Sequence, residues 1–298
     1  MILLCLLLIS IYLISRFATN NSDSQIFVQE NPSASLSATL SFLSPGENDV
    51  PTLPQPSDQV ITNGMRDKKE VALTFDADMT RGMKSFLVSG LVKSYDDVRV
   101  TNLLTRTQTK ATFFLTGMWI EIYPDATRQM AVNPLFELAN HSYSHPSFSG
   151  HCFGLPQIPQ SEFASEIAKT QSLLQDIAGV ANHYFRFPGG CYDAKALEIV
   201  RKEGLTVVHW DSAGSDGFNQ DTQQIARNVV DRAQNGSIIV LHLGGPNAPK
   251  TAEALAIIIP TLKNQGYSFV KVSEILGNNE VKPAAFNLKE YLNKALKI

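Results

Sequence analysis

Short apolar runs alternate with longer amphipathic runs over residues 71–276. Seven short runs have the length and flanking residues of buried strands; they are 71–75, 111–115, 134–138, 183–187, 206–210, 237–241 and 267–270. Four longer runs predict helices at 161–177, 194–204, 222–233 and 251–264. Ser161 can cap the first helix, and we expect Pro260 to kink or shorten the last. This alternation favours a mainly parallel sheet with right-handed crossovers, either open or closed into a barrel.

The N-terminal end has a different pattern. Residues 2–14 are almost wholly apolar, and Arg16 ends the run. A spanning helix usually needs roughly 20 residues, whereas this run has the length of a signal-peptide core. It has no positive n-region and no clean cleavage site, so residues 1–16 are interpreted as a signal peptide or an uncleaved membrane anchor. A buried N-terminal helix is the alternative, although the next segment offers it nothing to pack against.

The remaining chain divides by composition. Residues 17–65 are rich in Ser, Asn, Pro and Thr, which bury little apolar surface and indicate a linker. Residues 66–277 form the predicted folded domain, and 278–298 form a tail predicted to be helical. A leader followed by a spacer predicts an exported protein, either secreted or anchored in the membrane and facing outward.

Charge and cysteine content narrow the class of protein. The formal net charge is −3 and no block of Lys or Arg is present, so a nucleic-acid partner is not expected. Cys5 lies in the leader, whereas Cys152 and Cys191 lie in the folded part. In an oxidising compartment the latter two could form a disulfide at the rim of a site; two unlinked thiols are the alternative.

Ionisable residues lie at or just after the ends of five of the predicted strands; they are Asp76 and Asp78, His141 and His145, Arg186, Asp211 and Asp216, and His242. Because the C-terminal ends of parallel strands carry the active site in α/β folds, we expect most of these residues to meet. Asp211 is interpreted as structural rather than catalytic.

Two of these groups have the chemistry of a metal site. His141 and His145 are four residues apart, so their rings can point the same way. Two imidazoles and a carboxylate make an open site typical of catalytic zinc. Asp76 and Asp78 share a face in extended backbone, so one could bind a metal while the other accepts a proton. Alternatively, Asp78 caps the following segment.

Five ordered segments resemble the motifs of the polysaccharide deacetylase family, carbohydrate esterase family 4. They are 74–78 (TFDAD), 140–145 (NHSYSH), 186–190 (RFPGG), 210–216 (WDSAGSD) and 241–242 (LH). Residues 110–117 are also similar to a family segment, and the resemblance covers about 71–276. One such motif is weak evidence, but five in order are highly specific. The resemblance implies a distorted (β/α) barrel with about seven strands, fewer than the eight of a complete barrel.

The resemblance also implies residue roles. Asp76 corresponds to the general base, oriented by Arg186, and the backbone N–H near Gly189 would help to hold an oxyanion. Asp216 corresponds to the partner of His242, the general acid. The metal ligands would be His141, His145 and an aspartate, around a divalent metal for which zinc is expected and cobalt or nickel would also suit. Candidate substrate contacts are Trp210, Phe187 and Tyr192, although Trp210 is equally suited to the core.

The chain departs from the family pattern in three motifs. The family usually has two adjacent aspartates in the first motif, the second being a metal ligand, but here Ala77 holds that position. We expect Asp78 to be the displaced ligand, with an exchange of roles between it and Asp76 left open. Gly189 stands where an aromatic residue is usual, and Gly217 rather than Trp follows the fourth-motif aspartate. These departures bear on the substrate more than on the reaction.

The sequence therefore predicts a metal-dependent hydrolase that removes N-acetyl groups from a cell-surface or extracellular polysaccharide, such as peptidoglycan or a chitin-like glycan. O-deacetylation of acetylated xylan or a similar glycan is an alternative, because it uses the same water-activating apparatus. A glycan-binding pseudoenzyme is a further alternative, motivated by Ala77. The expected partners are the polysaccharide and, if the leader is uncleaved, the membrane.

Overall fold

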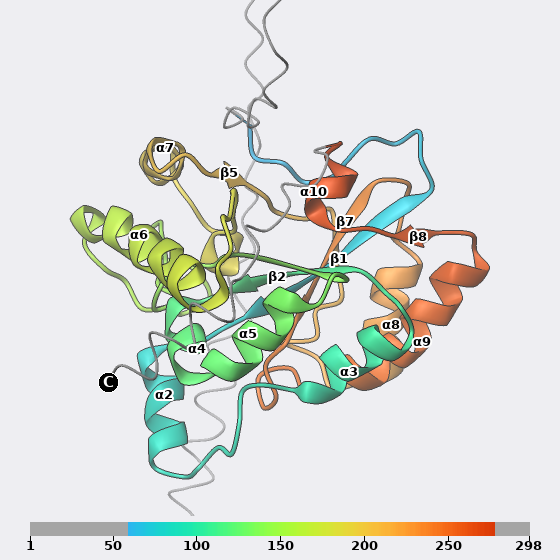
Figure 1. Ribbon diagram of the computed structural model, residues 1–298, viewed down its shortest axis with the longest axis horizontal. Helices are drawn as coiled ribbons and strands as arrows, with labels where there is room; N and C mark the ends of the chain where they lie inside the picture. The colour runs from blue at the N-terminus through green and yellow to red at the C-terminus, as the bar shows by residue number, and fades with distance from the viewer. Residues whose placement is uncertain (1–58, 278–298) are drawn as a thin grey trace, which may run out of the picture. The chain divides into compact units, whose positions relative to one another are not determined.

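The computed structural model describes residues 59–277 (Figure 1). The predicted leader, the linker as far as residue 58 and the predicted helical tail at 278–298 lie outside the described residues. Within 59–277, no helix has both the length and the apolar character needed to cross a membrane.

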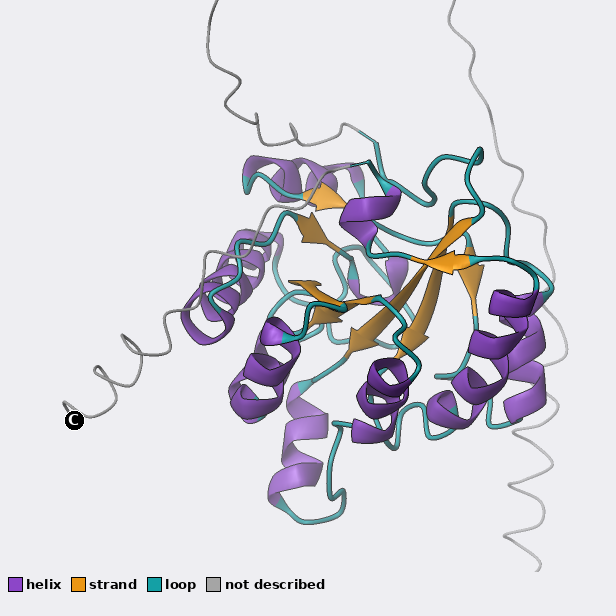
Figure 2. Ribbon diagram, turned by 45° about the vertical axis from the view of Figure 1, so that its right-hand side comes forward, coloured by secondary structure: helices purple, strands orange, loops and turns teal. Residues whose placement is uncertain are grey.

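One curled parallel sheet forms the centre of the domain. The strands follow the order β5-β4-β3-β2-β1-β7-β6, and β8 pairs with the start of β1. Their bounds are β1 Glu70–Ala77, β2 Ala111–Leu115, β3 Phe136–Asn140, β4 Tyr184–Phe185, β5 Thr206–Val207, β6 Ser212–Ala213, β7 Ser237–His242 and β8 Ser268–Phe269. Figure 2 shows the helices around the outside of this sheet. The arrangement is a half-barrel, which confirms the predicted distorted (β/α) barrel.

The helices fill the connections between strands. Their bounds are α2 Arg81–Val88, α3 Val98–Arg106, α4 Gly117–Ile122, α5 Pro124–Val132, α6 Phe163–Leu173, α7 Ala194–Lys202, α8 Thr222–Val230, α9 Thr251–Asn264 and α10 Val272–Ile275. A π-helical turn, Leu174–Ala178, continues α6. Pro260 does not shorten α9, which spans Thr251–Asn264 with the proline inside it. Pro260 is exposed, while Ile258, Ile259 and Leu262 are buried and hold both sides of it in the core.

The register of the sheet brings the strand ends level. Asp76 on β1 pairs with His242 on β7, and on the other side it pairs with Phe114 on β2. Leu115 then pairs with Asn140 at the end of β3, which pairs with Phe185 on β4. Residues that follow these positions therefore meet at one edge of the sheet.

The domain begins earlier than the predicted limit at residue 66. Ile61 forms an isolated bridge with Val208 and Asn63 forms one with Ser237, so part of the predicted linker is tied to the sheet. Arg66 then makes an ion pair with Asp211 at 2.7 Å. Asp211 also accepts a hydrogen bond from the Ile238 backbone N–H at 3.0 Å, which agrees with its structural interpretation.

Candidate active site

The end of β1 presents two carboxylates on one side of the strand. Ala77 is fully buried within the main hydrophobic core. Its neighbours Asp76 and Asp78 both face His141, whose Nε2 lies 3.7 Å from Asp76 Oδ2 and 3.5 Å from Asp78 Oδ1. Because side chains alternate along an extended strand, an acid at position 78 shares the face of Asp76, whereas one at 77 would face the core.

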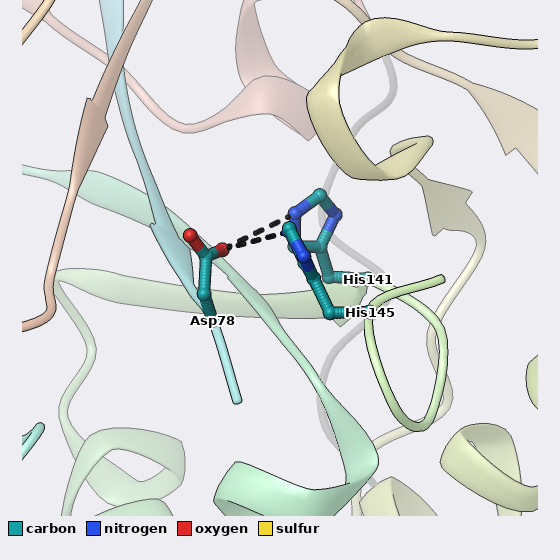
Figure 3. A group of neighbouring side chains, drawn as sticks. All are labelled: Asp78, His141 and His145. Atoms are coloured by element: carbon teal, nitrogen blue, oxygen red, sulfur yellow. Dashed lines mark ion pairs between the residues drawn. The ribbon is translucent and has the colours of Figure 1, made fainter. Parts of the chain in front are cut away.

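Asp78, His141 and His145 form a group that could hold a metal ion (Figure 3). One ligand atom from each lies within 4.8 Å of the others, and His145 Nε2 is 3.2 Å from Asp78 Oδ1. Asp78 Oδ1 and His141 Nε2 are buried, and neither has a hydrogen-bond partner among residues 59–277. Such convergent, unsatisfied N and O atoms fit a divalent cation.

Electrostatics favour an ionised Asp78. Burial alone would raise the pKa of its carboxyl group, but the charge of His145 and the close approach of the His141 and His145 imidazoles, at 3.5 and 3.2 Å, hold that pKa well below its usual range. Ligation requires a carboxylate, so Asp78 has the charge state of a ligand.

The loop that carries the two histidines has strained backbone. Ser142 and His145 adopt φ values of 65° and 58°, a region that non-glycine residues rarely occupy. Glu166 on α6 holds this loop by accepting hydrogen bonds from the N–H groups of Tyr143 (2.9 Å) and Ser144 (2.7 Å). The Ser144 hydroxyl donates a third, at 2.7 Å. This buried carboxylate therefore fixes the histidine loop from behind.

Arg186 orients Asp76. Its guanidinium is fully buried and donates to Asp76 Oδ1 at 2.7 Å and to the Thr74 hydroxyl at 2.8 Å. The same side chain also donates to the backbone carbonyls of Val208 and His209, each at 3.1 Å. One Asp76 oxygen is thus held by Arg186, and the other is directed towards His141.

His242 faces the metal group from β7. Its Nδ1 donates to Asp216 Oδ1 at 2.8 Å, and its Nε2 lies 4.0 Å from Asp78 Oδ2. Asp216 is itself held by the Thr251 hydroxyl at 2.5 Å. Burial alone would lower the pKa of His242, but the Asp216 carboxylate, with smaller contributions from Asp78 and Asp76, raises it to about 10. The imidazole therefore carries the proton that a general acid needs.

A glycine turn forms the rim of the site. Gly189 has φ 61°, and a Cβ there would lie 2.7 Å from Cys152 Sγ, so a larger residue would not fit. Cys152 is disulfide-bonded to Cys191, which decides between the two alternatives left by the sequence. Among the hydrogen bonds that join backbone groups in the turns and loops of residues 59–277, none uses the Gly189 N–H.

The three candidate substrate contacts differ in exposure. Phe187 is fully buried and stacks on Tyr192 at 5.0 Å between ring centroids, so it supports that ring and has no surface for a sugar. Tyr192 is 38% exposed, and Trp210 is partly buried over Arg186. Two further exposed rings, Phe153 and Phe218, contact each other at 5.8 Å between centroids.

Sequence reasoning missed two supporting residues. Glu166 lies on the apolar face of the predicted helix, beside Ile167, and an acid on a buried face was the available signal. The sequence around Thr251 gives no such signal, because it looks like that of any residue in the first turn of a helix.

The sequence is similar to those of known polysaccharide deacetylases. The family model described as polysaccharide deacetylase matches residues 63–208. A peptidoglycan-N-acetylglucosamine deacetylase from Bacillus cereus is 31% identical over 211 residues, which cover 70% of this chain and 68% of the relative.

Solved structures share the fold. A peptidoglycan N-acetylglucosamine deacetylase has a TM-score of 0.63 and 26% identity, over 75% of this chain and 95% of that one. A pseudoenzyme of carbohydrate esterase family 4 from Bacillus anthracis has a TM-score of 0.61 and 24% identity, over 76% and 71% of the two chains. The second likeness concerns the fold alone. With a relative this similar over two thirds of both chains, the chain belongs to the polysaccharide deacetylase family of hydrolases.

Proposed function

We propose that the chain is a metal-dependent hydrolase that removes N-acetyl groups from N-acetylglucosamine units of an extracellular polysaccharide, with peptidoglycan as the leading substrate. The observation that carries this proposal is the placement of the group Asp78, His141 and His145 between Asp76 and His242. The name of the Bacillus cereus relative supports the choice of substrate.

The metal group would hold a divalent cation, with zinc expected and cobalt or nickel also suited to one carboxylate and two imidazoles. When bound, such a cation supplies a Lewis acid that polarises the acetyl carbonyl and lowers the pKa of the attacking water.

The protein groups then move the protons. Asp76 accepts the proton of the attacking water, because Arg186 holds its carboxylate in place at 2.7 Å. The Gly189 N–H donates to the oxyanion that forms. An amine leaves poorly unless it is protonated, and His242 supplies that proton from the nitrogen that faces the site. Asp216 keeps this imidazole charged and oriented.

Export remains part of the proposal. It rests on the apolar run at 2–14 and the polar linker that follows, which together suit a secreted or membrane-anchored enzyme facing outward. Such an enzyme would meet cell-wall glycan first. Fractionation of cells that produce the full chain tests this, and recovery in the cytosol would contradict it.

Acetate release from N-acetylglucosamine oligomers tests the reaction. The full chain should release acetate after addition of zinc and not after chelation, and acetylated xylan should be the poorer substrate. His141→Ala should lower the rate by more than about 100-fold, because it removes a ligand.

His183→Ala is the matched control, since His183 lies at the other end of β4 from the site. It should retain the wild-type rate. A folded, zinc-loaded wild type that releases no acetate from any acetylated glycan would contradict the proposed function and favour a glycan-binding protein.

A further inference from the structure

A groove with a volume of about 640 Å³ opens next to the histidine loop. It lies between α2, the start of α4, the histidine loop and α6. Its lining residues are Arg81, Lys84, Ser85, Val88, Ser89, Met118, Tyr143 and Lys169. Three of these side chains are cationic, and acidic residues do not contribute to the lining.

Two residues of the groove lining are close in sequence to residues of the active site. Arg81 follows Asp78 by three residues, and Tyr143 lies between His141 and His145. The N–H of Tyr143 is one of those fixed by Glu166. Arg81 and Tyr143 therefore lie beyond the C-terminal ends of β1 and β3, at the edge of the sheet that carries the metal group.

The cations of the groove differ in their partners. Lys169 lies 3.3 Å above the centre of the Tyr143 ring and 3.8 Å from Glu121, so its charge is partly balanced. Arg81 and Lys84 are exposed, lie three residues apart on α2, and make no ion pair within residues 59–277. A local excess of positive charge in a chain of net charge −3 is a feature that a neutral glycan would not use.

We propose that this groove is a substrate subsite that binds a carboxylate carried by the glycan, an inference that rests on the proposed deacetylase function. Arg81 can hold a carboxylate through two parallel hydrogen bonds, and Lys84 adds a second charge. The substrate class is therefore an acidic N-acetylated glycan, in preference to neutral chitin or xylan. In peptidoglycan the carboxylate can come from the lactyl ether of a sugar or from an attached peptide.

The test measures kcat/KM for acetate release by the full chain on three glycans. These are neutral N-acetylglucosamine oligomers, peptidoglycan strands stripped of peptides so that lactyl carboxylates remain, and strands that keep their peptides. The ratio of acidic to neutral kcat/KM should fall about tenfold in the double variant Arg81→Gln/Lys84→Gln, as expected for two exposed charge contacts. Added salt should lower the wild-type ratio and leave that of the variant nearly unchanged.

The matched control is Arg106→Gln/Lys68→Gln. Arg106 ends α3 and Lys68 precedes β1, so both exposed cations lie towards the opposite edge of the sheet. This control should keep the wild-type ratio. If the wild type still prefers acidic over neutral glycan on stripped strands, the groove binds the lactyl carboxylate. If it shows that preference only on strands that keep their peptides, the groove binds a peptide carboxylate. An equal ratio in wild type and Arg81→Gln/Lys84→Gln would overturn the subsite.

Binding separates this inference from the proposed reaction. Sedimentation of wild type and both double variants with insoluble peptidoglycan, and with chitin, requires no turnover. If no glycan is deacetylated, the proposed function fails, yet weaker binding of Arg81→Gln/Lys84→Gln to peptidoglycan alone would still support the groove. Equal binding of all three proteins to peptidoglycan would overturn it.

Discussion

His141 and His145 reach the site on a loop, whereas His242 reaches it from the end of strand β7. The loop has left-handed backbone at Ser142 and His145, a conformation that costs about 1 kcal/mol or more at each residue. Three hydrogen bonds to Glu166 offset that cost. The backbone of His242 is in regular sheet register with β1, and its ring is held by Asp216.

This difference indicates how each side of the site would fail. The histidine loop depends on a strained backbone conformation, so a substitution that weakens it should lower both the metal content and the stability of the protein. General acid catalysis depends on the charge of the His242 imidazole, so a substitution that changes this charge should alter the pH dependence of the rate. Three substitutions test this contrast.

The largest effect is expected for Asp78→Ala. Loss of a ligand should lower kcat/KM by about 10³-fold, equivalent to several kcal/mol of transition-state stabilisation, together with the metal content. The double variant Ala77→Asp/Asp78→Ala should not recover activity, because position 77 faces the core. Acetate release and metal analysis check both variants. Recovered activity in the double variant would show that the end of β1 can rotate. The face of the strand that bears the aspartate would then not decide whether it binds the metal.

Asp216→Asn should act mainly on the acid. We expect kcat to fall about 100-fold, as for loss of an oriented general acid. Because Asp216 raises the pKa of His242, its removal lowers that pKa. The general acid must be protonated, so activity is lost as the pH rises through its pKa, and the alkaline limb of the pH–rate profile should move to lower pH. An unmoved limb with normal metal content would contradict the assignment of His242.

Glu166→Gln should have the smallest effect on the rate and act through stability. Replacing a carboxylate that accepts three hydrogen bonds should lower the free energy of unfolding by about 2 kcal/mol. Zinc should restore part of this loss, since ligation also holds the loop. Thermal unfolding with and without zinc measures both. Glu162→Gln, at an exposed position just before α6, should unfold like the wild type; an equal shift in both variants would remove the anchoring role of Glu166.

Seven of the strands and four of the helices follow runs that the sequence predicts, and the remaining elements could not be predicted. The strand Ala111–Leu115 lies where its apolar run predicts, but β3 begins two residues later than expected, at Phe136. The two-residue strand β6 has no periodicity to detect. Helices α2 to α5 were not predicted, although α7 and α8, which have nine residues each, were.

Some residues of the site could likewise be predicted from the sequence, and others could not. The motif residues could be found because each follows an apolar strand, and the sheet register then brings Asp76 and His242 together. Glu166 and Lys169 lie on a helix that comes from a distant part of the chain. Only the fold shows that they contact the histidine loop and the groove beside it.

The alternation of side chains along β1 has a consequence for comparing sequences within the family. A sequence pattern that requires two adjacent aspartates would treat Ala77 as a missing ligand. It would therefore classify this chain as inactive. In three dimensions, the carboxylates at positions 76 and 78 share one side of the strand, while an aspartate at 77 would be directed into apolar core. In this chain, the carboxylate at position 78 can therefore take the place that the usual family pattern gives to an aspartate at position 77.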